Sequence, residues 1–296
     1  MKTKRTTHVL FKVTPLGDDL NNPKVEELAV FSEEEYTVFI SDQRNISQFQ
    51  QTKNLFDCLS LNISNFLNLI IDIADSMLNK SKNPFSDHSI SIFGCYFNNT
   101  LSSYKTVLDH TDYSLIKAYG KDSKQFTSWK RIQSNCYDNA FEYRFLYRLR
   151  NYSQHIGLLP FHISTNQSIE NPGKLELRID LVKSDLLIEK NIWNQQLIIE
   201  ISKLPEYIPI VSILENWHTS ISRLRNTILT IRKEEAVDSA DRILQYRQKY
   251  EVDNSSLINI GHIVKNRDKS MDLTLMDIKE NIAYDVFQYR AKREEI

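Results

Sequence analysis

Between Leu55 and Met77, apolar residues recur at spacings of three and four over roughly seven helical turns. This period places them all on one face of an α-helix. The positions are Leu55, Leu59, Ile63, Phe66, Ile70, Ala74 and Met77. The apolar face of a helix this long must be buried against other elements, and in a helical bundle those elements are the neighbouring helices. The sequence therefore predicts a mainly α fold.

Three more amphipathic helices are expected, over residues 101–119, from about Ser134 to Gly157, and from Pro209 through Tyr246. The first should stop at Gly120, and the second at Gly157 and Pro160. The expected apolar face of the second consists of Phe141, Phe145, Leu149, Tyr152 and Ile156. That of the third consists of Ile210, Ile213, Trp217, Ile221, Leu224, Ile228 and Ile231. Such helices fit an antiparallel bundle.

Shorter β-prone runs flank and interrupt this predicted bundle. Strands are expected at 8–13, 27–31 and 36–40, within 171–182 and 196–201, and at 257–264. The last of these should be followed by a polar helix or coil. We therefore divide the chain into a strand-containing segment 1–50, a bundle 51–250 with a β insertion at about 165–204, and a C-terminal extension 251–296.

Composition excludes several classes of protein. The formal net charge is −1, so nucleic acid or an anionic membrane could be bound only by a local patch. The six glycines form no phosphate-binding loop, and the three cysteines and seven histidines show no ligand spacing. We expect no cofactor and no metal. The longest apolar stretch, 66–73, is too short to span a bilayer, and a cytoplasmic protein without a membrane partner is expected.

The chemistry-bearing stretch is residues 142–160, EYRFLYRLRNYSQHIGLLP. Arg144, Arg148, Asn151 and His155 are spaced by four, three and four, so they point the same way beside the apolar face. Arg150 lies about 100° from Asn151 around the helix, within reach of the same region. Guanidinium groups converging with an amide and an imidazole favour a phosphate ligand.

An imidazole can take and return a proton near neutral pH, and an arginine can stabilise charge that develops on phosphate oxygens. RNA carries its own nucleophile, the 2′-OH, so such a group needs no metal. The reaction that fits is attack of the 2′-oxygen on the adjacent phosphorus. Its products are a 2′,3′-cyclic phosphate and a free 5′-OH.

The run from Arg150 to His155 resembles the motif of the HEPN superfamily, an arginine, a polar residue, three variable residues and a histidine. The resemblance is firm on this helix and loose over 51–250. It implies a HEPN-like helical bundle and a metal-independent ribonuclease of toxin–antitoxin, abortive-infection or anti-phage defence systems. It assigns Arg150 and His155 to catalysis and Asn151 to their support. We place Arg144, Arg148, Tyr147 and Gln154 in the substrate-binding group.

Each of these residues also has a structural interpretation. The arginines, Arg144 above all, could pair with acids of a neighbouring helix. His155 could be a cation favoured by the helix C-terminus, and Tyr147 could serve packing. The alternative function is a non-catalytic HEPN-like module that binds a nucleotide or a protein.

The expected partners are RNA, a second copy of the chain, and an antitoxin or defence-system protein. A homodimer is expected because one motif supplies one histidine, and the leaving 5′-oxygen also needs a proton. The apolar residues Ile156, Leu158 and Leu159 could supply contact beside the two-fold axis.

Overall fold

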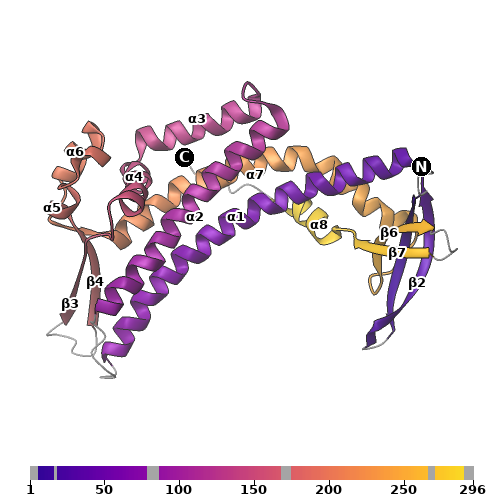
Figure 1. Cartoon of the computed structure of the whole chain (residues 1–296), viewed down its shortest axis with the longest axis horizontal. Coiled ribbons are helices and arrows are strands. Elements are labelled where there is room, and N and C mark those ends of the chain that lie inside the picture. The colour runs from indigo at the N-terminus through magenta and orange to yellow at the C-terminus, as the bar shows by residue number, and fades with distance from the viewer. Residues whose placement is uncertain (1–5, 17–18, 79–86, 168–174, 266–270, 290–296) are drawn as a thin grey trace. The chain divides into compact units, whose positions relative to one another are not determined.

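The computed structural model describes residues 6–16, 19–78, 87–167, 175–265 and 271–289. It is mainly helical, as expected from the sequence, and it contains two small antiparallel sheets (Figure 1). The long helices are α1 (Glu33–Leu78), α2 (Asp87–Tyr119), α3 (Lys124–Asn139), α4 (Phe141–His155) and α7 (Ile210–Lys249). The short ones are α5 (Lys183–Leu186), the 3-10 helix η1 (Lys190–Ile192), α6 (Gln195–Ser202) and α8 (Glu280–Gln288).

The first sheet has the strand order β2-β1-β6-β7, and the second has the order β3-β4-β5. The strands of the first are β1 (Thr6–Leu16), β2 (Asp19–Phe31), β6 (Leu257–Lys265) and β7 (Met271–Asp277). Those of the second are β3 (Phe161–Gln167), β4 (Leu175–Val182) and β5 (Tyr207–Pro209). Neighbouring strands are antiparallel throughout. The strands expected at 8–13, 27–31 and 257–264, and within 171–182, are confirmed.

The chain divides into two compact units. Unit 1 joins the residues up to Gln51 with those from Leu229 onward, and unit 2 is Thr52–Ile228. The expected boundary near residue 51 lies at this division, but the expected separation of 1–50 from 251–296 differs from it. The reason is strand pairing, because β6 lies between β1 and β7 and pairs with β1 along its length.

The strand expected at 36–40 is wrong, because these residues lie in the first turns of α1. Ser32 and Glu35 form a reciprocal N-terminal cap. The Glu35 amide donates to Ser32 Oγ at 3.2 Å, and the Ser32 amide donates to the Glu35 carboxylate at 2.8 Å. This capping box satisfies two amides that a helix start would otherwise leave unpaired. It decides the conformation of an apolar run that is β-prone in isolation.

The strand expected at 196–201 is also wrong, since this run is α6. Asn194 caps the helix by accepting a hydrogen bond from the Leu197 amide at 2.8 Å. Leu197 and Ile201, one helical turn apart, are both fully buried. The apolar run therefore follows helical spacing, which six residues were too few to reveal.

Other boundaries differ in detail. The helix expected from about Ser134 is two helices, because Ala140 has extended backbone angles (φ −119°, ψ 115°) that end α3 and begin α4. The helix expected at 101–119 begins already at Asp87, while its end at Gly120, with φ 85°, is confirmed. Strand β7 was not predicted. The helix predicted through Tyr246 is confirmed as α7.

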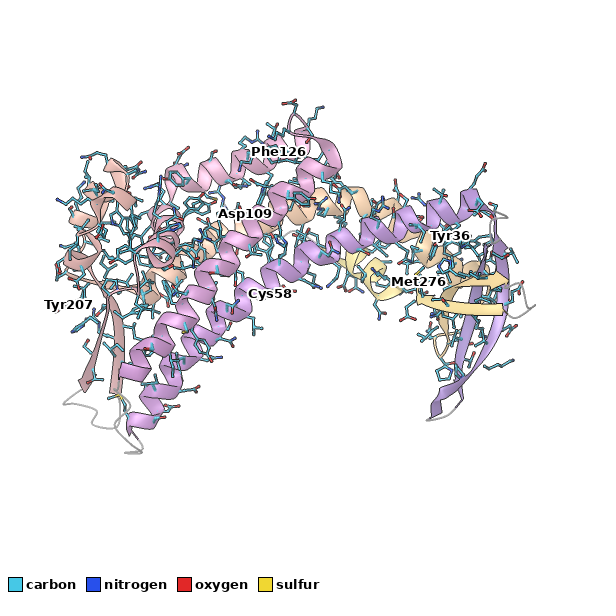
Figure 2. The ribbon with its side chains drawn as sticks, viewed as in Figure 1. Tyr36, Cys58, Asp109, Phe126, Tyr207 and Met276 are labelled. Carbon is cyan, nitrogen blue, oxygen red and sulfur yellow. The ribbon has the colours of Figure 1, made fainter. Side chains whose placement is uncertain are left out.

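Each unit has its own buried core. In unit 1 the sheet packs against α1, α7 and α8 through residues that include Leu10, Phe39, Ala240, Ile260 and Val286. In unit 2, aromatic side chains fill the space between the helices, and Tyr104 of α2 meets Trp217 of α7 edge to face at 4.8 Å. Figure 2 shows how densely side chains occupy the region around α4.

One described helix, α1, is long and apolar enough to cross a membrane by length and composition alone. This is weak evidence, because helices of soluble proteins pass the same test. Asn62, Asn65 and Asp72 interrupt the apolar run of this helix.

Candidate functional site

Helix α4 is held in unit 2 by its apolar face. Phe145 and Leu149 are fully buried, and Phe145 stacks on Trp193 at 5.8 Å between ring centroids. Tyr152 stacks on the same tryptophan at 6.3 Å. The helix ends as predicted, with the Ile156 amide donating to the Tyr152 carbonyl just before Gly157. Ile156 is 45% exposed, so the expected apolar face ends one turn early, because this residue lies beyond the last helical residue.

Arg144 does not lie with the other candidate residues. Its side chain is buried, and Nη2 and Nε donate to the Glu200 carboxylate of α6 at 2.6 and 3.4 Å. Nη1 donates to the Tyr137 carbonyl at 2.5 Å. The charge of Arg144 is therefore already neutralised within unit 2. The structural interpretation, an ion pair with a neighbouring helix, fits this residue and argues against its predicted contact with substrate. The sequence did not predict Glu200 as the partner of Arg144, because the segment 196–201 was expected to be a strand.

Arg148 and Arg150 have different surroundings. Both are half-buried, and in each the Nε atom is buried without a hydrogen-bond partner in the described part of the chain. Within the same residues, neither arginine lies within salt-bridge distance of a carboxylate. A half-buried guanidinium without an acid retains the ability to bind an anion. These two arginines are therefore the cations on α4 that remain available to a ligand.

His155 is the last residue of α4 and is exposed, as is Gln154. Asn151 is half-buried, one turn before His155. Among the described residues there is no hydrogen bond that joins Arg150, Asn151 and His155 directly. All three lie in the last two turns of α4, so a ligand would have to contact each side chain separately.

The tyrosines of α4 contact neighbouring aromatic rings. Tyr147 is half-buried and meets the Tyr137 ring edge to face at 6.2 Å. Burial raises the pKa of Tyr143 far above its ordinary value of 10. Burial, followed by the charges of Glu189 and Asp185, raises the pKa of Tyr152 as well. Because these phenols hold their protons more tightly, His155 is the side chain on α4 best suited to proton transfer near neutral pH.

Apolar side chains lie next to the helix end. Leu158 is 66% exposed, and it lies beside α2 at Gly94, where an added Cβ would be 3.7 Å from its Cδ2. Leu159 is buried in its own unit, so its expected role in contact with a second copy is wrong. Ile156 and Leu158 are the members of that expected set that stay accessible.

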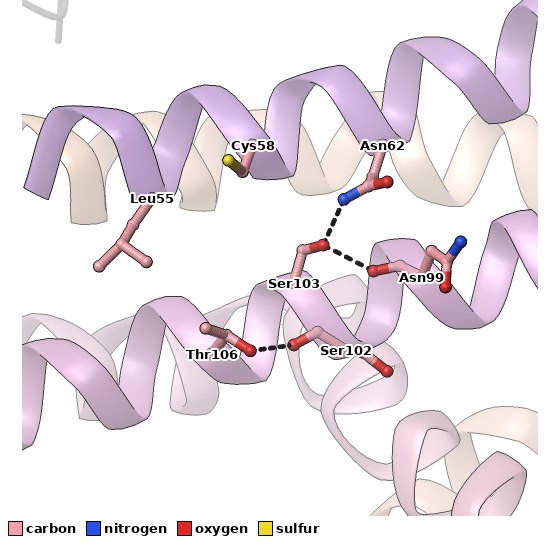
Figure 3. Close-up of a pocket in the computed structure, with 7 residues that line it drawn as sticks. All are labelled: Leu55, Cys58, Asn62, Asn99, Ser102, Ser103 and Thr106. Carbon is pink, nitrogen blue, oxygen red and sulfur yellow. Dashed lines mark hydrogen bonds between the residues drawn. The ribbon is translucent and has the colours of Figure 1, made fainter. Parts of the chain in front are cut away.

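A pocket lies between α1 and α2, apart from the predicted site residues (Figure 3). Its lining consists of Leu55, Cys58, Asn62, Asn99, Ser102, Ser103 and Thr106. Asn62 donates to Ser103 Oγ, which in turn donates to the Asn99 carbonyl at 2.7 Å. The bond from Asn62 ties α1 to α2, and the bond to the Asn99 carbonyl lies within α2.

The residues that the structure describes contain no group of three or more His, Cys, Asp or Glu side chains that could hold a metal ion. The three cysteines all lie in this part of the chain and form no disulfide, with Cys58 and Cys95 exposed and Cys136 buried. No family model, curated protein or solved structure matches this chain.

Proposed function

We propose that this protein is a metal-independent RNA endonuclease of the HEPN type, acting in the cytoplasm as a toxin or anti-phage defence effector. The observation that supports the proposal is that Arg148 and Arg150 lack acid partners among the described residues and share α4 with His155, its exposed last residue. Two available guanidiniums next to a proton-transfer group match the needs of phosphodiester cleavage. The resemblance of the run from Arg150 to His155 to the HEPN motif supports the same reaction.

In the proposed mechanism, His155 accepts the proton of a ribose 2′-OH while the 2′-oxygen bonds to the adjacent phosphorus. The bond from phosphorus to the 5′-oxygen breaks, and the leaving oxygen takes up a proton from the protonated His155 of a second copy of the chain, in the expected homodimer. Arg150 and Arg148 stabilise the negative charge on the phosphate oxygens, and Asn151 orients the imidazole or holds one of those oxygens. The strands end as a 2′,3′-cyclic phosphate and a 5′-OH.

The test is incubation of purified full-length protein with total RNA in EDTA. Wild type should cleave, and His155→Ala should lose at least a hundredfold in rate, as expected for a general base. His218→Ala is the matched control, since His218 is an exposed histidine on α7 of the same unit. Equal cleavage by folded His155→Ala and wild type would eliminate the mechanism.

A second variant tests whether Arg150 holds the phosphate by two hydrogen bonds. Arg150→Lys keeps the charge but loses the planar fork, so the rate should fall strongly if Arg150 holds two phosphate oxygens. If lysine serves equally well, Arg150 is a general electrostatic contact and Arg148 is the better candidate.

The alternative is a non-catalytic module, a partner or sensor subunit that holds a nucleotide or a protein with the same basic edge. RNA affinity that depends on Arg148 and Arg150, with no cleavage under any condition, would favour it. An antitoxin or defence-system protein remains an expected partner in either case.

A further inference from the structure

Two histidines meet inside unit 1, remote in sequence from the candidate site. His8 of β1 lies directly opposite His262 of β6 in the antiparallel register, and their Nδ1 atoms are 3.0 Å apart. His8 is only 8% exposed. We call these two residues the histidine pair. Their separation is that of a hydrogen bond between the two rings.

The first turn of α1 rests on the histidine pair. The ring of Tyr36, labelled in Figure 2, stacks on the His8 ring with centroids 3.6 Å apart and planes within 3°. The Tyr36 hydroxyl lies 3.4 Å from Nε2 of His262. The pair therefore joins two strands and the start of a helix.

A hydrogen bond between two Nδ1 atoms requires one proton between them, with one ring donating and the other accepting. Protonation of both rings places an N–H on each Nδ1, so two positive groups face each other at 3.0 Å with no acceptor between them. The rings must then separate. Separation also disturbs Tyr36, which touches both rings.

Little in the surroundings compensates for a second charge. The Glu33 carboxylate of α1 lies 3.9 Å from Nε2 of His8, on the side of the ring away from His262, and it is 82% exposed. An exposed carboxylate at that distance contributes little. On β7 the residue opposite His262 is the neutral Thr274. Burial, and then the neighbouring His8, lower the pKa of His262.

We propose that the histidine pair is a pH-sensitive latch, which holds the first turn of α1 on the four-stranded sheet at neutral pH and releases it in acid. The direction follows from proton linkage. The folded state binds the second proton less readily than the unfolded or opened state does. The latch's contribution to stability is fully present above pH 6.5, the ordinary pKa of the imidazole, and is lost as pH falls through the lowered pKa of His262.

Hydrogen exchange of the full-length protein, followed by mass spectrometry of peptides, tests the latch. Protection of the peptides covering residues 32–37 and 257–264 is compared at about pH 7.5 and pH 5.5, corrected for the intrinsic exchange rates. Wild type should lose protection in acid by up to about tenfold per pH unit, the limit for uptake of one extra proton. His262→Gln keeps an acceptor for His8 but cannot be charged, so its protection should change much less.

His162→Gln is the matched control. His162 lies in the other sheet and stacks on Tyr207 at 4.1 Å rather than on a second histidine. The His162→Gln protein should lose exchange protection in acid as wild type does. If His262→Gln loses protection as steeply as wild type, the latch is excluded.

A measurement on wild type alone covers the case in which His262→Gln does not fold. Nitrogen chemical shifts of the two imidazoles report their protonation, and amide exchange reports the state of α1. If both rings become charged while the amides of the first turn stay protected, the proposal is overturned. Release of the first turn as the second ring becomes charged supports it.

Discussion

Three arginines within seven residues of α4 occupy different electrostatic surroundings. Arg144 is buried and bound by Glu200 and the Tyr137 carbonyl. Arg148 and Arg150 are half-buried with no acid partner in the described part of the chain. A buried ion pair that is broken leaves a charge without its partner, whereas removal of an unpaired guanidinium leaves nothing behind. Structural and ligand-binding roles should therefore separate within one helix.

Substitution of these arginines should show that separation. Arg144→Ala should lower the free energy of unfolding by about 2 kcal/mol, because it removes the ion-pair partner of Glu200 and the donor to the Tyr137 carbonyl. Arg148→Ala should change it by less than about 0.5 kcal/mol but weaken RNA binding in a His155→Ala background. Denaturant unfolding and fluorescence anisotropy measure the two effects. The opposite pattern, with Arg148→Ala unstable and Arg144→Ala defective only in RNA binding, would reverse the assignment.

At the level of elements, the start of α1 depends on a local cap. Ser32 and Glu35 exchange hydrogen bonds, and those bonds lower the pKa of Glu35. The cap's contribution is present above pH 4.5, the ordinary pKa of this carboxyl, and is lost as pH falls through the lowered value. The effect of the cap begins below pH 4.5 and that of the histidine pair below pH 6.5, so the histidine pair responds first as pH falls.

Ser32→Ala should loosen the first turn of α1 at neutral pH. Loss of an N-cap side chain typically corresponds to about a fivefold drop in local exchange protection. The measurement is hydrogen exchange of residues 33–37. Ser41→Ala, at an exposed site further along the same helix, should be neutral or slightly stabilising because alanine favours helix. Equal effects of the two substitutions would show that the cap contributes nothing.

At the level of the whole molecule, the proposed chemistry requires a second proton-transfer group, since one chain supplies one motif. We expect a symmetric homodimer that brings two copies of α4 together, with the exposed Ile156 and Leu158 in contact beside the axis. This expectation depends on the proposed function.

Light scattering of wild type should give the mass of a dimer, and Leu158→Asp should shift it toward the monomer. Co-expression of tagged His155→Ala chains with wild-type chains then yields hybrid dimers. These should be nearly inactive if both histidines serve one composite site, and half-active if each protomer works alone. A monomer that cleaves RNA at full rate would contradict the expectation.

The sequence by itself determined that the long helices exist, and where α2 and α4 end. The apolar spacing from Leu55 to Met77 and from Ile210 to Ile231 repeats over many turns, so neighbouring residues confirm one another. The breaks at Gly120 and Pro160 act through backbone angles that depend on the residue itself. The motif-bearing segment and its helical end were readable for the same reason.

Only the tertiary structure decided the conformation of the short apolar runs, the strand pairing and the partners of the arginines. The apolar runs at 36–40 and 196–201 are too short to show a period, and capping side chains at Ser32 and Asn194 made them helical. The pairing of β1 with β6, and with it the histidine pair, joins residues about 250 positions apart. Arg144 and Arg148 look equivalent along the helix, and only the position of Glu200 separates them. Local spacing fixes local structure, whereas pairing and charge compensation depend on distant residues that meet only in the folded chain.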